Sequence, residues 1–437
     1  MIVFLQMNDV KVICVKESFD WIEIIEGTDS KRYLENNTIT ETQLQHMKEK
    51  WSEVGLDLKS ILWGDKKFKF INYVGYFQVE DIAFEILPKV SPHNDYQQMR
   101  NGLIEMINTC YELDILVDYT PNKLDQGDLK EILAKYFANT LLKELHRGIS
   151  QEYRLIEENA TSLKGQLLLA QHIRKNVLNN KPYQVAVSYE ERVDNHILNQ
   201  VLKRATSSLI QTVRSFETKT QLQRIDYLLD KVESRSFTKH QLNEIRLNRT
   251  NKRFEKPFKL AKQFLLNETN TMQHHDFTNT FVVMFKMNNL FEAYIAILLE
   301  EIVDRPVYAQ DQRHHLFKNE KTNRDIFQLV PDVVIGDENQ LIIDTKWKRI
   351  FDKEKVIRSG VKREDMFQMY AYLTRYKHAR RGVLLYPKTE QPKGEDLFLQ
   401  SWKLEDKDIL LRVYSVSLID RETTEKELLQ IVSDISS

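Results

Sequence analysis

The sequence is poor in cysteine, glycine and proline, and each shortage narrows the class of protein. Its 437 residues include 2 cysteines, Cys14 and Cys110. Both lie in apolar surroundings without a metal-ligating neighbour, which excludes a cysteine metal cluster and predicts buried structural thiols. The 12 glycines and 9 prolines fit a helix-rich chain with few long loops.

Long apolar runs are also missing. No run approaches the about 18 residues that a membrane-spanning helix needs. The first residues, MIVFLQMNDVK, lack the basic region and the small-residue cleavage site of a signal peptide, and they predict a first β-strand. A phosphate-binding sequence of the form G-x-x-x-x-G-K-[ST] is absent, so this chain is not expected to hydrolyse a nucleotide itself. We therefore expect a cytoplasmic protein without membrane contact.

The chain has no large excess of charge of either sign, but its net charge of −1 conceals two basic segments. Residues 346–381 include twelve Lys or Arg and four Asp or Glu, and residues 246–262 include seven and one. Such segments predict phosphate contacts that depend on salt but not on sequence. Ordinary solvated helix faces are the alternative.

The chain is too long for one compact core, so two or three domains are expected. The 10% aromatic content argues against disorder. Residues 1–95 alternate apolar and polar positions and predict a β-rich N-terminal domain, with one helix that starts after Thr40 and ends at Gly55. Residues 96–269 have helical spacing and predict a mainly helical middle region. Residues 270–437 predict a third domain.

Two stretches of the middle region depart from helical spacing. Residues 149–176 predict an extended stretch, a turn at Lys164-Gly165 and a further strand or helix. Residues 175–200 carry no recognisable chemistry, and we assign them to packing between domains.

The third domain mixes the two periodicities, which predicts an α/β fold with a mixed sheet. Its first feature is a long helix, and a polar loop with His314 and His315 follows, for which a solvated loop or a DNA contact is expected. The predicted elements are a helix over 277–303, a loop over 309–325, two strands around the turn sequence GDEN, a helix over 364–379, and strands over 381–387 and 408–418.

Three charged residues lie beside very apolar strands in this domain. The stretch PDVVIGDENQLIIDTK predicts a hairpin that starts after Asp332 and returns to Asp344 and Lys346. Alternate residues of a strand share one face, so Asp344 and Lys346 point the same way and Asp332 can lie beside them. A surface hairpin with an ion pair is the alternative.

Two neighbouring carboxylates repel each other unless a positive charge lies between them. Mg²⁺ prefers hard oxygen ligands, so we expect a Mg²⁺ ion held by Asp332, Asp344 and the backbone carbonyl of Thr345. Lys346 can then orient a metal-bound water or neutralise charge that grows on a phosphate.

Two helices add candidate residues. Glu292 lies in the apolar segment NNLFEAYIAILL, where a carboxylate needs a partner. Gln368 and Tyr372 are four residues apart and share a helix face. An ion pair that stabilises the fold is the alternative for Glu292, and a surface face with a half-buried tyrosine is the alternative for the other two.

The order Glu292, Pro331-Asp332, Asp344-Thr345-Lys346 and Gln368 to Tyr372 resembles the signature of the PD-(D/E)xK nuclease superfamily. Longer segments narrow this resemblance. NYVGYFQVEDIAFEILPKV, YELDILVDY, YEERVDNHILNQVLKRA, MNNLFEAYIAILLEE and DTKWKR are similar to the McrC family, the nuclease subunits of McrBC-type restriction systems, over about residues 65 to 390.

The resemblance implies a restriction-endonuclease-like C-terminal domain that cleaves double-stranded DNA with Mg²⁺, with catalytic roles for Asp332, Asp344, Lys346, Glu292 and Gln368. It also implies that the N-terminal domain docks on a hexameric AAA+ GTPase, McrB, and stimulates its hydrolysis of GTP. GTP is then bound by the partner and not by this chain. A non-catalytic activator of the AAA+ ring is the alternative function.

Overall fold

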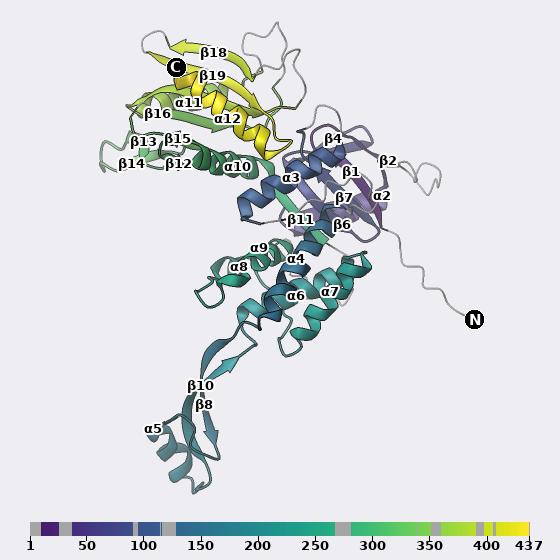
Figure 1. Ribbon diagram of the computed structural model, residues 1–437, viewed down its shortest axis with the longest axis vertical. Coiled ribbons are helices and arrows are strands. Elements are labelled where there is room, and N and C mark those ends of the chain that lie inside the picture. Colours follow the sequence, from purple (N-terminus) through teal and green to yellow (C-terminus); the bar gives the residue numbers. More distant parts are fainter. Residues whose placement is uncertain are drawn as a thin grey trace, which may run out of the picture. The chain divides into compact units, whose positions relative to one another are not determined.

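The computed structural model describes residues 10–25, 37–90, 95–113, 115, 128–266, 281–338, 340–350, 360–389, 397–404 and 408–436. The chain forms two compact units (Figure 1). The first combines Met1–Leu129 with Thr278–Ser437, and the second is Lys130–Phe277. In the described part of the chain, no helix is both long and apolar enough to cross a membrane. The strand predicted for the first residues lies largely outside the described ranges, since description begins at residue 10.

A four-stranded sheet joins the two ends of the first unit. Its strand order is β1-β7-β6-β11, with β1 parallel to β7 and the other neighbours antiparallel. Its last strand therefore comes from the C-terminal part of the chain. The strands are β1 (Lys11–Lys16), β6 (Tyr73–Val79), β7 (Ile82–Leu87) and β11 (Phe281–Lys286).

Strand β11 corrects the long helix predicted over 277–303. The described part of that stretch is β11 followed by helix α10 (Met287–Ile302). The sequence FVVMFK is rich in β-branched and aromatic residues, and its first five side chains are buried. Pairing with β6 satisfies its backbone, so tertiary contacts override the helical spacing that continues into α10.

A smaller sheet with the order β3-β2-β5-β4 packs beside the first one around a shared apolar core. The predicted helix after Thr40 is confirmed as α2, because the Thr40 hydroxyl and Gln43 form a capping box. Trp51 on α2 stacks on Phe70 and lies in this core. The elements here are β2 (Ile22–Ile25), β3 (Thr38–Thr40), α2 (Glu41–Glu53), η1 (Leu58–Ser60), β4 (Ile61–Gly64), β5 (Lys67–Phe70) and α3 (Tyr96–Tyr111).

The C-terminal part of the first unit is built on a six-stranded sheet with the order β12-β15-β16-β17-β19-β18. The predicted hairpin and mixed sheet are confirmed, since β15 pairs antiparallel with β16 while β16, β17 and β19 run parallel. Helix α11 packs on one face through the core that contains Ile342 and Leu384. The elements are β12 (Val307–Ala309), β15 (Val333–Ile335), β16 (Gln340–Thr345), α11 (Arg363–Arg375), β17 (Ala379–Pro387), β18 (Phe398–Leu404), β19 (Ile409–Val416) and α12 (Arg421–Ser436).

The loop predicted over 309–325 is wrong in part, because it contains a strand. β13 (His314–Lys318) pairs with β14 (Asp325–Leu329) as a two-stranded hairpin. The polar residues of this stretch hid the strand, since no side chain of β13 is fully buried and its sequence HHLFK lacks an apolar alternation.

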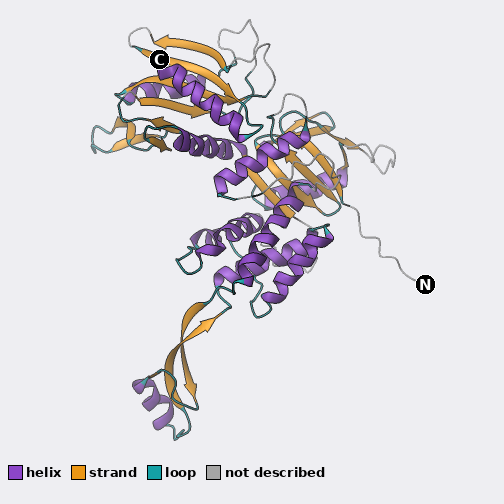
Figure 2. Ribbon diagram, in the orientation of Figure 1, coloured by secondary structure: helices purple, strands orange, loops and turns teal. Residues whose placement is uncertain are grey.

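The second unit is a helical bundle from which a β-ribbon extends (Figure 2), with α5 at the far end of the ribbon (Figure 1). β10 pairs with β8 over nine residues and with β9 over two. The assignment of residues 175–200 to domain packing is therefore wrong for the part that forms β10. The elements are α4 (Leu129–His146), β8 (Glu152–Ala160), β9 (Gln166–Leu167), α5 (Leu169–His172), η2 (Ile173–Val177), β10 (Val185–Val193), α6 (Ile197–Thr212), α7 (Phe216–Leu228), α8 (Lys239–Glu244), η3 (Lys252–Phe254) and α9 (Glu255–Leu266).

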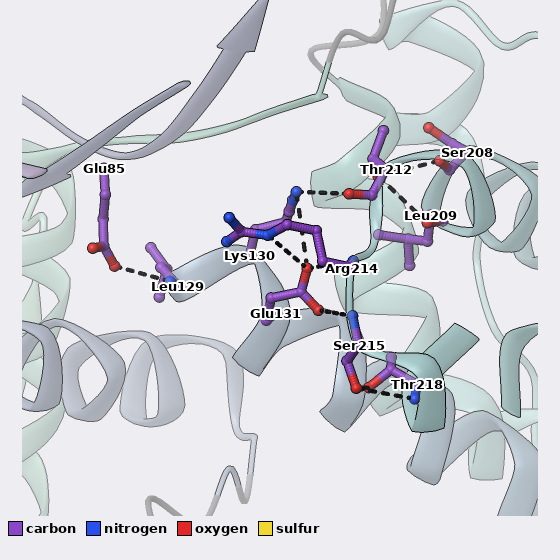
Figure 3. Close-up of polar contacts among 10 residues, drawn as sticks. All are labelled: Glu85, Leu129, Lys130, Glu131, Ser208, Leu209, Thr212, Arg214, Ser215 and Thr218. Carbon is purple, nitrogen blue, oxygen red and sulfur yellow. Dashed lines mark hydrogen bonds and ion pairs between the residues drawn. The ribbon is translucent and has the colours of Figure 1, made fainter. Parts of the chain in front are cut away.

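Buried charges at the start of α4 tie this helix to the turn between α6 and α7 (Figure 3). The Glu131 carboxylate accepts hydrogen bonds from the backbone N–H groups of Arg214 and Ser215, which form the turn between α6 and α7. Lys130 donates to the carbonyl of Thr212 at 2.7 Å. The bundle is thus cross-linked by charged groups that a helical pattern alone does not reveal.

Candidate active site

The hairpin places Asp332 against the stretch Asp344-Thr345-Lys346. Val333, directly after Asp332, pairs with Ile343, directly before Asp344. One oxygen of Asp332, Oδ2, accepts the backbone N–H of Thr345 at 2.7 Å and its hydroxyl at 2.8 Å. These two bonds favour the ionised form of Asp332, but burial is the larger effect and raises the pKa of its carboxyl.

Asp344 is a buried carboxylate for which the ammonium of Lys346 is the one polar side-chain partner found among the described residues. Its side chain is 0% exposed, and neither oxygen accepts a hydrogen bond from the described residues. The ammonium of Lys346 forms an ion pair with Oδ2. Burial raises the pKa of Asp344, the nearby charge of Asp332 raises it further, and Lys346 opposes both effects.

A second buried carboxylate of the same unit shows how unusual this state is. Asp311 is also buried, but both of its oxygens accept hydrogen bonds from Arg313, at 2.9 Å and 2.7 Å. Among the carboxylates of the described residues, Asp344 alone has buried oxygens with no hydrogen-bond partner. A buried carboxylate that is compensated by one ammonium and no hydrogen bond is costly, so this one requires a function or an additional ligand.

Lys346 is held by a chain of hydrogen bonds from helix α11. Its ammonium donates to Gln368 Oε1 at 2.9 Å. The amide of Gln368 donates to the hydroxyl of Tyr372 at 2.8 Å, and that hydroxyl donates to the carbonyl of Val330 at 2.9 Å. Gln368 and Tyr372 therefore fix the lysine instead of forming a surface face.

Glu292, on helix α10, lies close enough to Asp332, Asp344 and Lys346 for their charges to act on its carboxyl. Burial raises the pKa of its carboxyl to about 7, and the charges of Asp332 and Asp344 contribute in the same direction. The amide of Gln310, one residue beyond the end of β12, donates to Glu292 Oε1. Sequence reasoning missed Gln310 because it belongs to no motif and meets Glu292 only through the fold.

A hard divalent cation fits these residues. The orphaned oxygens of Asp344, one oxygen of Asp332 and the carbonyl of Thr345 are the oxygen ligands that Mg²⁺ prefers. Within the ranges that the structure describes, no group of three or more Asp, Glu, His or Cys side chains is placed to hold a metal ion. This sparse ligand set suits Mg²⁺, which keeps several of its waters, better than Zn²⁺.

The two basic segments are only partly available for phosphates. In 346–381, Lys348 binds both oxygens of Asp365, and residues 351–359 are not described. In 246–262, Arg253 donates to the carbonyl of Gly148 and Lys259 pairs with Glu255. The predicted phosphate contacts thus stay a prediction for the remaining cations.

The chain is similar to one family and to solved complexes of that family. The profile of the family described as McrBC 5-methylcytosine restriction system component matches residues 68–387. A half-complex from a tetradecameric assembly of Thermococcus gammatolerans McrB AAA+ hexamers with bound McrC is similar at a TM-score of 0.70 and 17% identity, over 97% of this chain and 100% of that chain. The cryo-EM structure of the Thermococcus gammatolerans McrBC complex is similar at a TM-score of 0.50 and 21% identity, over 66% of this chain and 87% of that chain. None of the curated proteins matches the chain.

These matches agree with the residues that carried the resemblance in the sequence. The profile covers more than half of the chain, and the fold similarity extends over nearly all of it. The predicted α/β fold class is confirmed by the same structural match. The chain belongs to the family of McrBC 5-methylcytosine restriction system components.

Proposed function

We propose that this chain is the Mg²⁺-dependent endonuclease subunit of a McrBC-type restriction system and hydrolyses phosphodiester bonds of double-stranded DNA. The observation that carries this proposal is the orphaned carboxylate of Asp344, beside Asp332 and paired with a lysine that Gln368 holds in place. Arg313 satisfies both oxygens of Asp311, whereas neither oxygen of Asp344 accepts a hydrogen bond from the described residues and only Oδ2 forms an ion pair.

Each residue of the site has a separate task in this mechanism. Asp332, Asp344 and the carbonyl of Thr345 would hold Mg²⁺, which lowers the pKa of a bound water and neutralises phosphate charge. Lys346 presents its ammonium toward the attacked phosphate and stabilises the charge that develops there. Glu292, with its pKa raised to about 7, can accept or release a proton at neutral pH.

We also propose an AAA+ GTPase of the McrB type as the partner, which binds GTP and is stimulated by this chain. The solved structure that is similar over 97% of this chain contains McrB AAA+ hexamers with bound McrC. Docking was predicted for residues 1–95, and it stays a prediction for that domain. The β-ribbon of the second unit offers an additional surface, because large apolar side chains are exposed along it: Tyr153, Leu155, Leu163, Leu167, Leu169, Ile173, Val177, Leu178 and Tyr183.

Exposed apolar side chains in such number are typical of a surface that a partner covers. Tyr183 is 84% exposed and Leu178 is 76% exposed, although both residue types usually lie against other protein. This ribbon also supports the alternative function, an activator of the AAA+ ring. The two functions are compatible because the ribbon belongs to the second unit, whereas Asp332 and Asp344 belong to the first.

A reconstituted assay separates the two functions. The full chain is mixed with its cognate GTPase, GTP, Mg²⁺ and DNA, and both DNA cleavage and GTP hydrolysis are measured. We expect Asp344→Asn and Lys346→Met to abolish cleavage while GTPase stimulation persists, and Asp311→Asn to cleave normally as the matched control. Cleavage at the wild-type rate by both site variants would show that the assigned site is wrong.

A further inference from the structure

A buried pair of opposite charges in the first unit takes no part in the mechanism above. The side chains of Glu17 and Lys89 are 0% and 3% exposed, and their Oε1 and Nζ atoms are 3.3 Å apart. Removing two charges from water is costly, and the attraction between them often fails to offset that cost. The pair therefore calls for a role other than simple stabilisation.

Both charges contact Trp347, the residue directly after Lys346. The indole N–H of Trp347 donates to Glu17 Oε1 at 2.7 Å. The ammonium of Lys89 lies 3.5 Å from the carbonyl oxygen of Trp347 and 5.1 Å from the centre of its ring. The second oxygen of Glu17 accepts the backbone N–H of Asn72 at 3.1 Å, so the carboxylate itself is fixed to the N-terminal region.

Further contacts tie this region to both sides of the site. Phe291, directly before Glu292, packs on Trp347 with 5.4 Å between the ring centres. The carbonyl of Asn72 accepts the N–H of Met287 at 2.9 Å, where α10 begins. The guanidinium of Arg349 lies 3.9 Å from the ring centre of Phe19. The segments that carry the site lysine and Glu292 are thus both held by residues of the N-terminal region.

Trp347 lies just after the end of a strand, where its contacts can fix the backbone next to Lys346. The N–H of Lys348 turns back to the carbonyl of Lys346 at 2.8 Å. Strand β16 ends at Thr345, and the N–H of Lys346 makes a last hydrogen bond to the sheet, with the carbonyl of Leu385 at 2.8 Å. Beyond that bond the sheet no longer fixes the backbone. The two contacts of Trp347, through its indole and its carbonyl, take over that task one residue after Lys346.

We propose that the Glu17–Lys89 pair is a positioning element of the nuclease centre, which fixes Trp347 and through it Lys346 and Asp344. The inference rests on the proposed nuclease function. According to this proposal, residues of the N-terminal region position the groups of the cleavage site, in addition to any docking role. Misplacement of a catalytic group by about 1 Å can lower a rate by about 100-fold, so a distant clamp of this kind has a measurable effect.

The test removes the pair without leaving an unpaired charge. The variant Glu17→Leu with Lys89→Met replaces both partners by apolar side chains, an exchange that often preserves stability. The matched control, Glu85→Leu with Arg100→Met, removes another ion pair of the first unit, between β7 and α3, whose atoms are 2.6 Å apart. No contact of this pair with Trp347 is found in the described residues. Trp347→Phe keeps the ring and removes the indole donor.

We expect kcat for DNA cleavage, measured with the GTPase partner, to fall about 10- to 100-fold in the Glu17/Lys89 variant and in Trp347→Phe. KM for DNA should change less than about 2-fold, since the phosphate contacts are untouched. Adding Trp347→Phe to the Glu17/Lys89 variant should have little further effect, because both remove the same contact. The Glu85/Arg100 control should cleave like wild type.

A second readout needs neither partner nor DNA. Hydrogen exchange of the amides of Thr345 and Lys346 should accelerate in the Glu17/Lys89 variant and stay unchanged in the control. Unchanged exchange together with kcat within about 2-fold of wild type would overturn the proposal, as would an equal loss of kcat in the control. If the wild-type protein fails to cleave DNA, the proposed nuclease function is wrong. Faster hydrogen exchange of Thr345 and Lys346 in the Glu17/Lys89 variant would still show that the pair fixes this segment.

Discussion

The hairpin that carries Asp332 and Asp344 and the β-ribbon of the second unit depart from ordinary burial in opposite directions. The hairpin buries the charged side chain of Asp344 at 0% exposure. The ribbon exposes apolar side chains, with Tyr183 at 84% and Leu178 at 76%. Charged groups usually lie on the surface and large apolar groups in the interior, so both regions lower the free energy of unfolding.

The direction of each departure indicates what is missing. The buried carboxylate of Asp344 has one cation, Lys346, and no hydrogen bond from the described residues, so it can accept a further positive ligand, and an exposed apolar surface lacks a protein that covers it. The comparison therefore predicts that changes at the hairpin act on chemistry, whereas changes at the ribbon act on assembly. The predictions that follow test this division.

The largest effect is expected from Asp332→Asn. An amide cannot supply the negative charge that a Mg²⁺ ligand needs, so cleavage should fall about 1,000-fold or more, comparable to the loss of a main electrostatic group in other enzymes. Cleavage of a labelled DNA duplex in the reconstituted system measures it. Binding to the GTPase should be unchanged, and weakened binding would show that the hairpin also serves assembly.

The next effect is expected at the ribbon. Leu178→Asp combined with Tyr183→Asp places two charges where a partner would bury apolar surface, and should weaken binding to the GTPase about 100-fold. Because both residues are exposed, the melting temperature should stay within about 1 °C of wild type. Tyr227→Asp, a change on helix α7 at 77% exposure, is the control. Equal losses in variant and control would exclude a specific role for the ribbon.

A smaller effect concerns stability and pH. Burial raises the folded-state pKa of Asp344 to about 7. The carboxyl therefore favours the fold fully at pH below its unfolded pKa of about 4, and this contribution is lost as the pH rises through about 7. Asp344→Asn mimics the neutral form and should be more stable than wild type at pH 8, by about 4 kcal/mol, and equally stable at pH 4. Urea unfolding without added metal measures this, and a variant less stable at pH 8 would contradict the account.

The smallest effect is expected for the residues that fix Lys346. Gln368→Leu removes the acceptor of the ammonium and should lower kcat about 10-fold, because the lysine stays present but loses its orientation. Tyr372→Phe removes a hydroxyl one bond further away and should lower it about 3-fold. A larger loss of kcat in Tyr372→Phe than in Gln368→Leu would contradict the proposal that Gln368 holds Lys346 directly and Tyr372 acts through Gln368.

The hairpin and its neighbours were predictable because their signals are local. Apolar runs on both sides of a turn define the strands, and the period of two places Asp344 and Lys346 on one face. The capping box at Thr40 likewise marked α2. These features depend on residues a few positions apart, so a single sequence reveals them.

The remaining features depend on partners far away in the sequence. β11 became a strand because β6 lies about 200 residues earlier, and Trp347 meets Glu17 across 330 residues. The strand β10 was missed because three consecutive buried side chains are followed by three exposed charged ones, so its sequence lacks a strict alternation. Such contacts leave no periodic signal in the sequence.

Metal binding by the full chain tests the central claim most directly, because it needs neither DNA nor the GTPase. Calorimetric titration with Mn²⁺, a surrogate for Mg²⁺ with similar oxygen ligands, should show one saturable site in wild type and in the Asp311→Asn control. That site should be lost in both Asp332→Asn and Asp344→Asn. Unchanged Mn²⁺ binding in these two variants would contradict the assignment of the two carboxylates as metal ligands.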